Sequence, residues 1–173
     1  MNQNEEEMLV KRAQNGDREA LGQLWDALTP KLFGYLINVT HDRMLAEDIF
    51  QTTWFKAINN LAHFQLRGVG FSAWLFAIAK NEYRQYWRKQ KREIAFDPVE
   101  HDPQDPDQKD IESKIFIEQV LGLLSEEDRE LIRLRYIADL PVRDIALILK
   151  LNFVTVRVRI HRAIARLRAA IAA

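Results

Sequence analysis

The stretch PVRDIALILKLNFVTVRVRIHRAIARLRAAI, residues 141–171, decides how the chain is interpreted. Its apolar residues recur at helical spacing on both sides of the segment KLN, which predicts a helix over 141–149, a short turn and a second helix over 153–171. From residue 141 onward, seven basic residues face one acid, Asp144. The sequence therefore predicts a helix-turn-helix pair whose second helix is cationic.

Turning the second helix by about 100° per residue separates an apolar side from a polar side. The apolar side, expected to be buried, holds Val156, Ile160, Ala163, Ile164, Leu167 and Ile171. The opposite side holds Thr155, Val158, His161, Arg162 and Ala165, with Arg157 and Arg159 on the flanks. Arginines can reach phosphates while central residues reach base edges, so this side suits a DNA major groove.

The alternative interpretation of this helix is a solvated arginine-rich face on an ordinary amphipathic helix. It explains the charge but not Val158, because an exposed valine gains nothing from water. Apolar contact with the methyl group of thymine is a known way to discriminate bases. DNA binding is therefore the favoured interpretation.

Charge and composition divide the rest of the chain. Residues 80–93 are basic, whereas residues 94–112 hold seven acids against one lysine, together with three of the five prolines. The segment DPVEHDPQDPDQKD has almost no large apolar side chains to bury, which predicts an extended solvated linker. We expect two small helical domains, 1–93 and 110–173, joined by an acidic flexible linker over 94–109.

The acidic linker also suggests a hypothesis about the free protein. Lying between two basic modules, it could rest against their DNA-binding surfaces and weaken non-specific DNA binding. The alternative is a spacer that only keeps the chain in solution.

Outside the linker, helical spacing dominates and strand-like alternation is scarce, so the chain is predicted to be all-α. The predicted helices cover 5–14, 17–38, 45–60, 71–92, 110–124, 126–137, 141–149 and 153–171. Gly16 is expected to end the first helix and Asp17 to cap the second, while Ser125 and Asn152 cap later ones. Pro30 is expected to bend or break the second helix.

The predicted helix over 71–92 mixes apolar, aromatic and basic residues. Its apolar side holds Phe71, Trp74, Leu75 and Ile78, and its basic side holds Lys80, Arg84, Arg88 and Lys91, bordered by Phe76, Tyr83 and Trp87. Cations follow a nucleic-acid backbone and aromatic rings stack on unpaired bases, which favours melting or single-stranded DNA. Phe71 and Trp74 are expected in the core, and Trp87 could be core or surface.

The predicted helix over 45–60 carries apolar residues outside its packed stripe. The stripe holds Ile49, Phe50, Thr53, Trp54 and Ala57, while Asp48, Gln51, Thr52 and Phe55 fall elsewhere. A phenylalanine outside the stripe indicates docking to a partner, although single exposed apolar residues are common.

Several classes of protein are not expected. The chain has no cysteine, its four histidines are scattered without a metal-binding spacing, and it lacks a glycine-rich phosphate loop, so we expect no metal, no cofactor and no enzyme. It opens with MNQNEEEM rather than a basic export signal. Its longest apolar stretch, 71–79, is shorter than the ~20 residues of a membrane span. A cytoplasmic protein without membrane insertion is expected.

Taken in order, several segments resemble an extracytoplasmic-function sigma factor of bacterial RNA polymerase over nearly the whole chain. They are AEDIFQTTWFKA, FSAWLFAIAKNEYRQYWRKQKR, the acidic linker and LSEEDRELIRLRYIADLPVRDIALILKLNFVTVRVRIHRAIARL. The resemblance implies an alternative sigma factor that binds core RNA polymerase and promoter DNA. Its first domain would bind the polymerase clamp and open the minus-ten element, and its second would recognise the minus-thirty-five element beside the flap. It also implies an anti-sigma factor that covers both domains.

The resemblance implies roles for individual residues. Those matching the clamp-binding surface are Asp48, Gln51, Thr52 and Phe55. Those matching the loop that captures a flipped minus-ten base are Phe64, Gln65, Leu66, Arg67 and Gly68. Asn81 matches a position that contacts this element, and Lys80, Arg84 and Arg88 are expected to hold the strand backbone. Recognition-helix positions match Arg157, Val158, His161 and Arg162, to which the helical periodicity adds Arg159 on the flank.

Three residues depart from the family pattern. Lys150 stands at the usual turn glycine, Pro141 at the usual helix cap, and Val158 at a frequent small polar residue. The minus-thirty-five preference of relatives therefore does not carry over. The alternative function is a stand-alone helix-turn-helix repressor or activator, which would bind a palindromic operator unaided. A sigma factor would bind promoter duplex poorly alone and co-purify with core polymerase.

Overall fold

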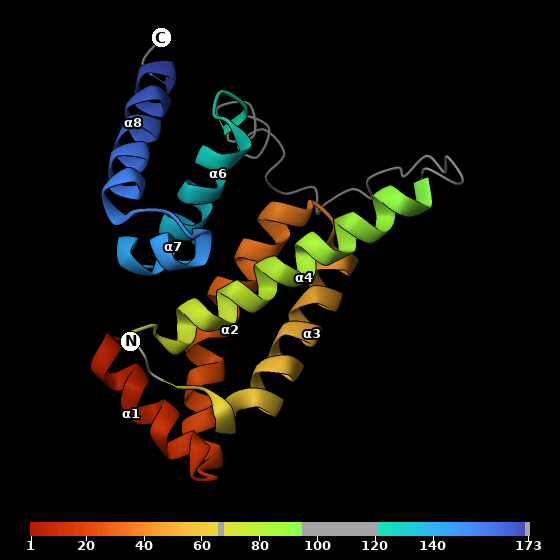
Figure 1. Cartoon of the computed structure of the whole chain (residues 1–173), viewed down its shortest axis with the longest axis vertical. Coiled ribbons are helices and arrows are strands. Elements are labelled where there is room, and N and C mark those ends of the chain that lie inside the picture. The colour runs from red at the N-terminus through yellow and green to blue at the C-terminus, as the bar shows by residue number, and fades with distance from the viewer. Residues whose placement is uncertain (66–67, 95–120, 172–173) are drawn as a thin grey trace. The chain divides into compact units, whose positions relative to one another are not determined.

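Figure 1 shows a computed structural model of the chain, which describes residues 1–65, 68–94 and 121–171. Within these ranges every regular element is a helix, so the all-α prediction is confirmed. No helix in this part of the chain is both long enough and apolar enough to cross a bilayer. The predicted linker, apart from residue 94, lies outside the described residues.

The chain divides into two compact units, Met1–Gln104 and Asp105–Ala173. The helices of the first unit are α1 (Gln3–Gln14), α2 (Arg18–Thr40), α3 (Arg43–Asn60), the 3-10 helix η1 (Leu61–His63) and α4 (Phe71–Ile94). In Figure 1, α2 and α3 lie side by side and α4 runs across them. Leu24, Tyr35, Trp54 and Phe76 are fully buried among these helices and form the centre of the core.

The helix ends of the first unit follow the predicted signals. Gly16 takes a φ of +87° after α1, a conformation that glycine adopts without steric cost. The Asp17 carboxylate accepts from the backbone N–H of Ala20 at 3.1 Å and caps α2. This bond and the ion pair with Arg12 lower the pKa of Asp17 below its ordinary value.

Of the two effects predicted for Pro30, a bend or a break in α2, the break is wrong. The helix continues from Arg18 to Thr40 with Pro30 inside it and exposed. Leu28 and Leu32, on either side of the proline, are buried, and α2 packs against α1 and α3. Tertiary packing of the apolar face therefore outweighs the loss of one backbone donor.

In the second unit the described helices are α6 (Glu126–Ile132), the π-helical turn η3 (Arg133–Ile137), α7 (Val142–Leu149) and α8 (Phe153–Ile171). The helix predicted over 126–137 is thus α-helical first and π-helical at its end. The Ser125 hydroxyl accepts from the Asp128 N–H at 3.2 Å, which confirms the predicted cap. Leu131, Leu134 and Ile145 are fully buried at the centre of this core.

The turn between α7 and α8 places Lys150 in the left-handed region, with φ 55° and ψ 42°. The Leu151 N–H donates to the carbonyl of Ala146 at 2.9 Å and closes the end of α7, as in a Schellman motif. Asn152 then accepts from the N–H of Val154 at 2.8 Å and begins α8, as predicted. A helix-turn-helix pair is confirmed at the predicted place.

Candidate functional site

The connector between α3 and α4, residues 61–70, borders an open cavity of about 790 Å³. Three of the predicted minus-ten residues line it, namely Phe64 and Gln65 from the connector and Asn81 from α4. Gly68 lies in the same connector with a φ of +75°. The other two loop residues, 66 and 67, are outside the described ranges.

Aromatic rings form one wall of this cavity. The ring centroids of Phe64 and Trp74 lie 4.7 Å apart with their planes tilted by 33°. Phe64 also meets Phe71 edge-on at 5.7 Å. Phe71 is buried as expected, but Trp74 is half-buried and lines the cavity with Ile78, so its assignment to the core alone is wrong. The helical spacing of Trp74, Ile78 and Asn81 would have placed the tryptophan on the functional face.

A second hollow of about 480 Å³ continues along α4 from Asn81. Arg84 and Arg88 line it together with Trp87, so two predicted backbone-binding cations lie beside an aromatic ring. Trp87 is 38% exposed, which resolves its open assignment in favour of the surface. Lys80 is half-buried and lines neither hollow.

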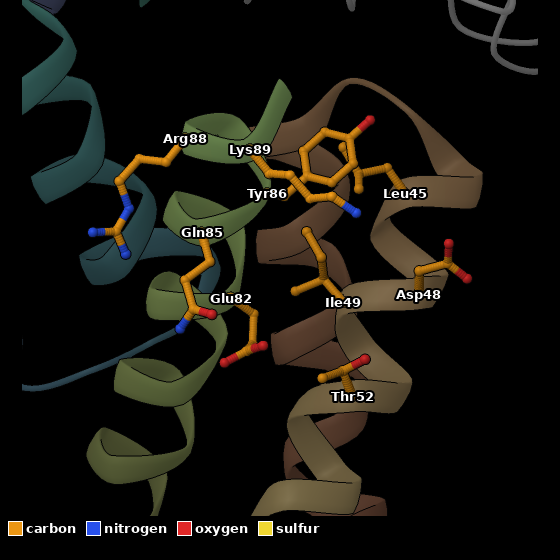
Figure 2. Close-up of a pocket in the computed structure, with 9 residues that line it drawn as sticks. All are labelled: Leu45, Asp48, Ile49, Thr52, Glu82, Gln85, Tyr86, Arg88 and Lys89. Atoms are coloured by element: carbon orange, nitrogen blue, oxygen red, sulfur yellow. The ribbon is translucent and has the colours of Figure 1, made fainter. Parts of the chain in front are cut away.

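A groove of about 560 Å³ runs between α3 and the second half of α4. Figure 2 shows Tyr86 and Lys89 reaching from α4 toward α3, while Asp48 points away from α4. Asp48 and Thr52, both predicted to bind polymerase, line this groove. It therefore combines apolar walls with charges of both signs.

The other two predicted polymerase-binding residues, Gln51 and Phe55, lie on the exposed face of α3. The phenylalanine side chain is 67% exposed. Met44 and Ile58, which the sequence analysis did not single out, are also exposed, and with Asp48 they continue the same face at spacings of four and three residues. Such spacing gives a straight seam suited to a partner helix.

The polar face predicted for α8 is exposed. Arg157, Val158, His161 and Arg162 are all open to solvent, whereas Val156 and its apolar neighbours at Ile160 and Ala163 are buried. The described structure thus separates the two faces as the helical periodicity predicts.

The expected burial of Ile171, at the end of α8, is wrong, because this side chain is 60% exposed. Arg166 lies 3.7 Å from Asp128 in the first turn of α6. Ile171 follows Arg166 by five residues and so lies about 7.5 Å further along α8, beyond this contact with α6.

Arg159 is held inside the second unit. Its guanidinium pairs with Asp128 at 2.8 Å and with Glu127 at 2.9 Å, and its side chain is only 26% exposed. Partial burial lowers the pKa of Arg159, but its hydrogen bonds with Asp128 and Glu127 outweigh that effect and raise the pKa above its ordinary value. The predicted DNA contact by Arg159 stays a prediction, and the geometry shows a tie between α8 and α6.

No group of three or more histidine, aspartate or glutamate side chains that could hold a metal ion occurs among the residues the structure describes. The cavities are instead lined by aromatic rings, amides and cations, which are groups that bind bases and phosphates.

Comparison with known proteins gives the family. Residues 24–93 match the model of Sigma-70 region 2, and residues 117–167 match that of Sigma-70, region 4. The RNA polymerase sigma-H factor of Pseudomonas aeruginosa is 30% identical over 179 residues, which cover 94% of this chain and 92% of the relative. The ECF RNA polymerase sigma factor BldN of Streptomyces coelicolor is 26% identical over 92% of this chain, which spans 64% of that relative's length.

Two solved structures of sigma-factor relatives support the same family. The sigma factor RpoE of Bartonella quintana, in complex with the anti-sigma factor NepR, has a TM-score of 0.70 at 28% identity, covering 87% of this chain and 96% of the other. CnrH, in complex with the cytosolic domain of CnrY, has a TM-score of 0.69 at 26% identity, covering 96% and 97%. With both region models in their expected order and a relative matched along nearly its full length, the chain belongs to the sigma-70 family, as an extracytoplasmic-function sigma factor of bacterial RNA polymerase.

Proposed function

We propose that this sigma factor binds core RNA polymerase and directs it to promoters by contacting two DNA elements. The observation that carries the proposal is the convergence of Phe64, Gln65 and Asn81 on one cavity, which adjoins the hollow lined by Arg84 and Arg88. A base that leaves the duplex can stack on the aromatic rings of the cavity, while the neighbouring arginines bind the phosphates of its strand.

The first unit would act on the minus-ten element. Arg84 and Arg88 would hold strand phosphates, and the cavity at Phe64 and Trp74 would receive a base that has left the stack. Unstacking a base costs a few kcal/mol, which binding in this cavity would offset. The chain would make no covalent bond itself, because the polymerase active site performs the chemistry.

The polymerase would dock on the exposed face of α3. Phe55 is the most suitable anchor, because a large exposed ring buried on association dominates the energy of an interface. Asp48, Gln51 and Thr52 would surround it, and Met44 and Ile58 would extend the contact along the helix.

The second unit would recognise the minus-thirty-five element with α8. Arg157 and Arg162 would contact phosphates or base edges, and Val158 would contact a thymine methyl group. We assign Arg159 a positioning role, because Asp128 and Glu127 already hold its guanidinium. The two compact units support the proposed division into domains 1–93 and 110–173.

An anti-sigma factor is a further proposed partner. One structural neighbour, RpoE, was solved with the anti-sigma factor NepR, and another, CnrH, was solved with the cytosolic domain of CnrY. Exposed apolar side chains on α3 in the first unit, and others on α8 in the second, would each be available to such a protein. Because polymerase and promoter DNA are the other partners, we place the protein in the cytoplasm.

In-vitro transcription with core polymerase and a library of promoters tests the proposal. The chain should confer start-site selection on bare core enzyme, and Phe55→Ala should reduce it by weakening polymerase binding, by at least about 2 kcal/mol for an anchor residue. Met8→Ala, which removes an exposed apolar side chain on α1, is the control. Failure of the unaltered chain to select start sites would reject the proposal.

The second candidate function is a stand-alone repressor or activator, which the exposed cationic face of α8 also permits. Such a protein would bind a palindromic operator tightly without polymerase. A binding assay with the free chain and the selected promoters separates the two, since a sigma factor should gain its DNA affinity only with core enzyme.

A further inference from the structure

Helix α1 is tied to both ends of the connector that carries the predicted base-capture residues. At the start of the connector, the side-chain amide of Gln14 donates to the carbonyl oxygens of Leu61 at 2.9 Å and Phe64 at 2.7 Å. Beyond its end, the carboxylate of Glu6 accepts from the backbone N–H of Ser72 at 3.0 Å. These partners lie 47, 50 and 66 residues away in sequence.

The Glu6 contact replaces a missing helix cap. Gly70 precedes α4 and its carbonyl accepts the first helical hydrogen bond, from Trp74, but glycine has no side-chain oxygen to accept from the second helical N–H. Glu6 supplies that oxygen from another helix, and its negative charge also suits a helix N-terminus. A glutamate that is only 7% exposed is unusual, and this contact accounts for its burial.

The Gln14 contact fixes the other end. A side-chain amide has two N–H donors, and both here meet connector carbonyls, so the backbone at Phe64 has a defined position. The ring of Phe64 is then set against Trp74 at 4.7 Å, in the wall of the cavity of about 790 Å³. A shift of the Phe64 backbone would change the shape of that wall.

From this arrangement we infer that Gln14 and Glu6 are positioning residues for base capture: α1 holds the two ends of the connector so that the Phe64 cavity fits a flipped minus-ten base. This inference rests on the proposed role of the connector in the proposed function. It adds a helix that lies outside the predicted DNA-contacting residues and outside the matched region 2.

The test uses holoenzyme, assembled from core polymerase and the full chain, and a forked promoter DNA chosen from the library. The minus-ten element of this DNA is single-stranded. In a series of such DNAs, each base of the element in turn is replaced by an abasic site. With the unaltered chain, the position at which base removal weakens binding identifies the captured base. If Gln14 and Glu6 only stabilise the fold, their replacement should weaken binding equally on intact and abasic DNA. If they position the cavity, the loss of affinity should occur only on DNA that carries the captured base.

Gln14→Met keeps side-chain length and removes both donors. We expect it to bind the intact fork roughly three- to tenfold more weakly, the range of one to two neutral hydrogen bonds, and to equal the unaltered chain on the fork that lacks the captured base. Gln23→Met is the matched control, since Gln23 is an exposed glutamine whose amide contacts only Glu19 on its own helix. Equal losses on intact and abasic forks would overturn the inference.

A second pair of variants tests the other end of the connector. Glu6→Gln keeps an oxygen that can accept from Ser72 and should retain most of the base-dependent affinity, whereas Glu6→Met should behave like Gln14→Met. Equal losses for both Glu6 variants on intact and abasic forks would assign Glu6 to packing alone and contradict the inference. If no base matters even for the unaltered chain, base capture itself fails, whereas failure of start-site selection in the library assay would show that the proposed function fails.

Discussion

The surfaces that we propose for DNA binding differ in shape between the two units. The first is hollowed, with two adjoining cavities lined by Phe64, Trp74 and Trp87, and it contains all four tryptophans of the chain. The second presents one exposed helix face, and partly buried ion pairs hold that helix against α6. A cavity can receive a base that has left the stack, whereas an exposed helix fits the major groove of an intact duplex. The difference in shape therefore supports different proposed tasks, with the first unit capturing an unpaired base and the second recognising intact duplex.

The largest expected effect tests whether the units are separate in stability. Leu24 and Leu134 are both fully buried, one in each unit. Each change to alanine should cost its own unit about 2–5 kcal/mol, because it leaves a cavity. Since all tryptophans belong to the first unit, the tryptophan-detected denaturant transition should shift for Leu24→Ala and not for Leu134→Ala, which should alter only the helical signal. Equal tryptophan shifts would show that the units unfold as one.

A second test compares how cations of the two units act on DNA. Arg162→Ala should lower holoenzyme affinity by about 1–3 kcal/mol at promoters that carry one particular base, if the arginine contacts a guanine. Arg84→Ala should instead weaken binding almost uniformly across sequences and reduce the salt slope by about 1. Affinities over single-base promoter variants at several salt concentrations measure both. An equal loss of affinity on all promoter variants for Arg162→Ala would contradict the proposed difference between the two units.

A third test concerns the tie between α8 and α6. Arg159→Met and Asp128→Asn should each destabilise the second unit, and a double-mutant cycle should give a coupling of about 1 kcal/mol, because the pair is partly shielded from water. Arg157→Met, an exposed arginine on the same helix, should leave stability unchanged. If the two substitutions lowered the stability of the second unit additively, the positioning role proposed for Arg159 would be contradicted.

A smaller effect is expected for Val158. Replacing the contacted thymine of the minus-thirty-five element with deoxyuridine removes one methyl group and should cost up to about 0.8 kcal/mol of holoenzyme binding. Val158→Ser should abolish the difference between the two DNAs, while Ala165→Ser on the same face should preserve it. Equal binding of thymine and deoxyuridine DNA by the unaltered chain, at every position, would reject the methyl contact.

The smallest expected effect is on how the stability of the first unit changes at acidic pH. A lowered pKa means that folding favours the charged form of Asp17, so its contribution is present above the ordinary value of 3.8 and is lost as pH falls through the lower folded value. Asp17→Asn keeps a capping oxygen and should flatten this acid dependence of the tryptophan-detected transition. An unchanged profile would show that Asp17 does not cause it.

Much of this molecule could be predicted from local signals. Asp17, Ser125 and Asn152 mark helix starts because their side chains accept from backbone N–H groups two or three residues on, and Gly16 marks a helix end because it adopts a positive φ. The periodicity of α8 separated the buried face around Val156 from the exposed face because packing follows the helical repeat.

The failures share a different cause. The break at Pro30 and the burial of Ile171 were wrong because each depends on how other helices pack, and the ion pair of Arg159 was missed for the same reason. Arg159 meets Asp128 across 31 positions of sequence, and no helical repeat shows such a partner. The role that we propose for α1 could not be predicted for the same reason, because Gln14 and Glu6 bond backbone groups that are far away in sequence.

The lysine in the turn of the helix pair has a further consequence. A left-handed residue with a Cβ costs roughly 1–2 kcal/mol, and the cationic side chain at the end of α7 recovers part of that through the helix dipole. Lys150 is exposed and lies just before α8, the helix that we propose contacts DNA, so a nearby phosphate would add a further favourable interaction with its charge. In the proposed promoter complex this charge interaction would offset part of the backbone strain at Lys150, so promoter binding would also stabilise the second unit.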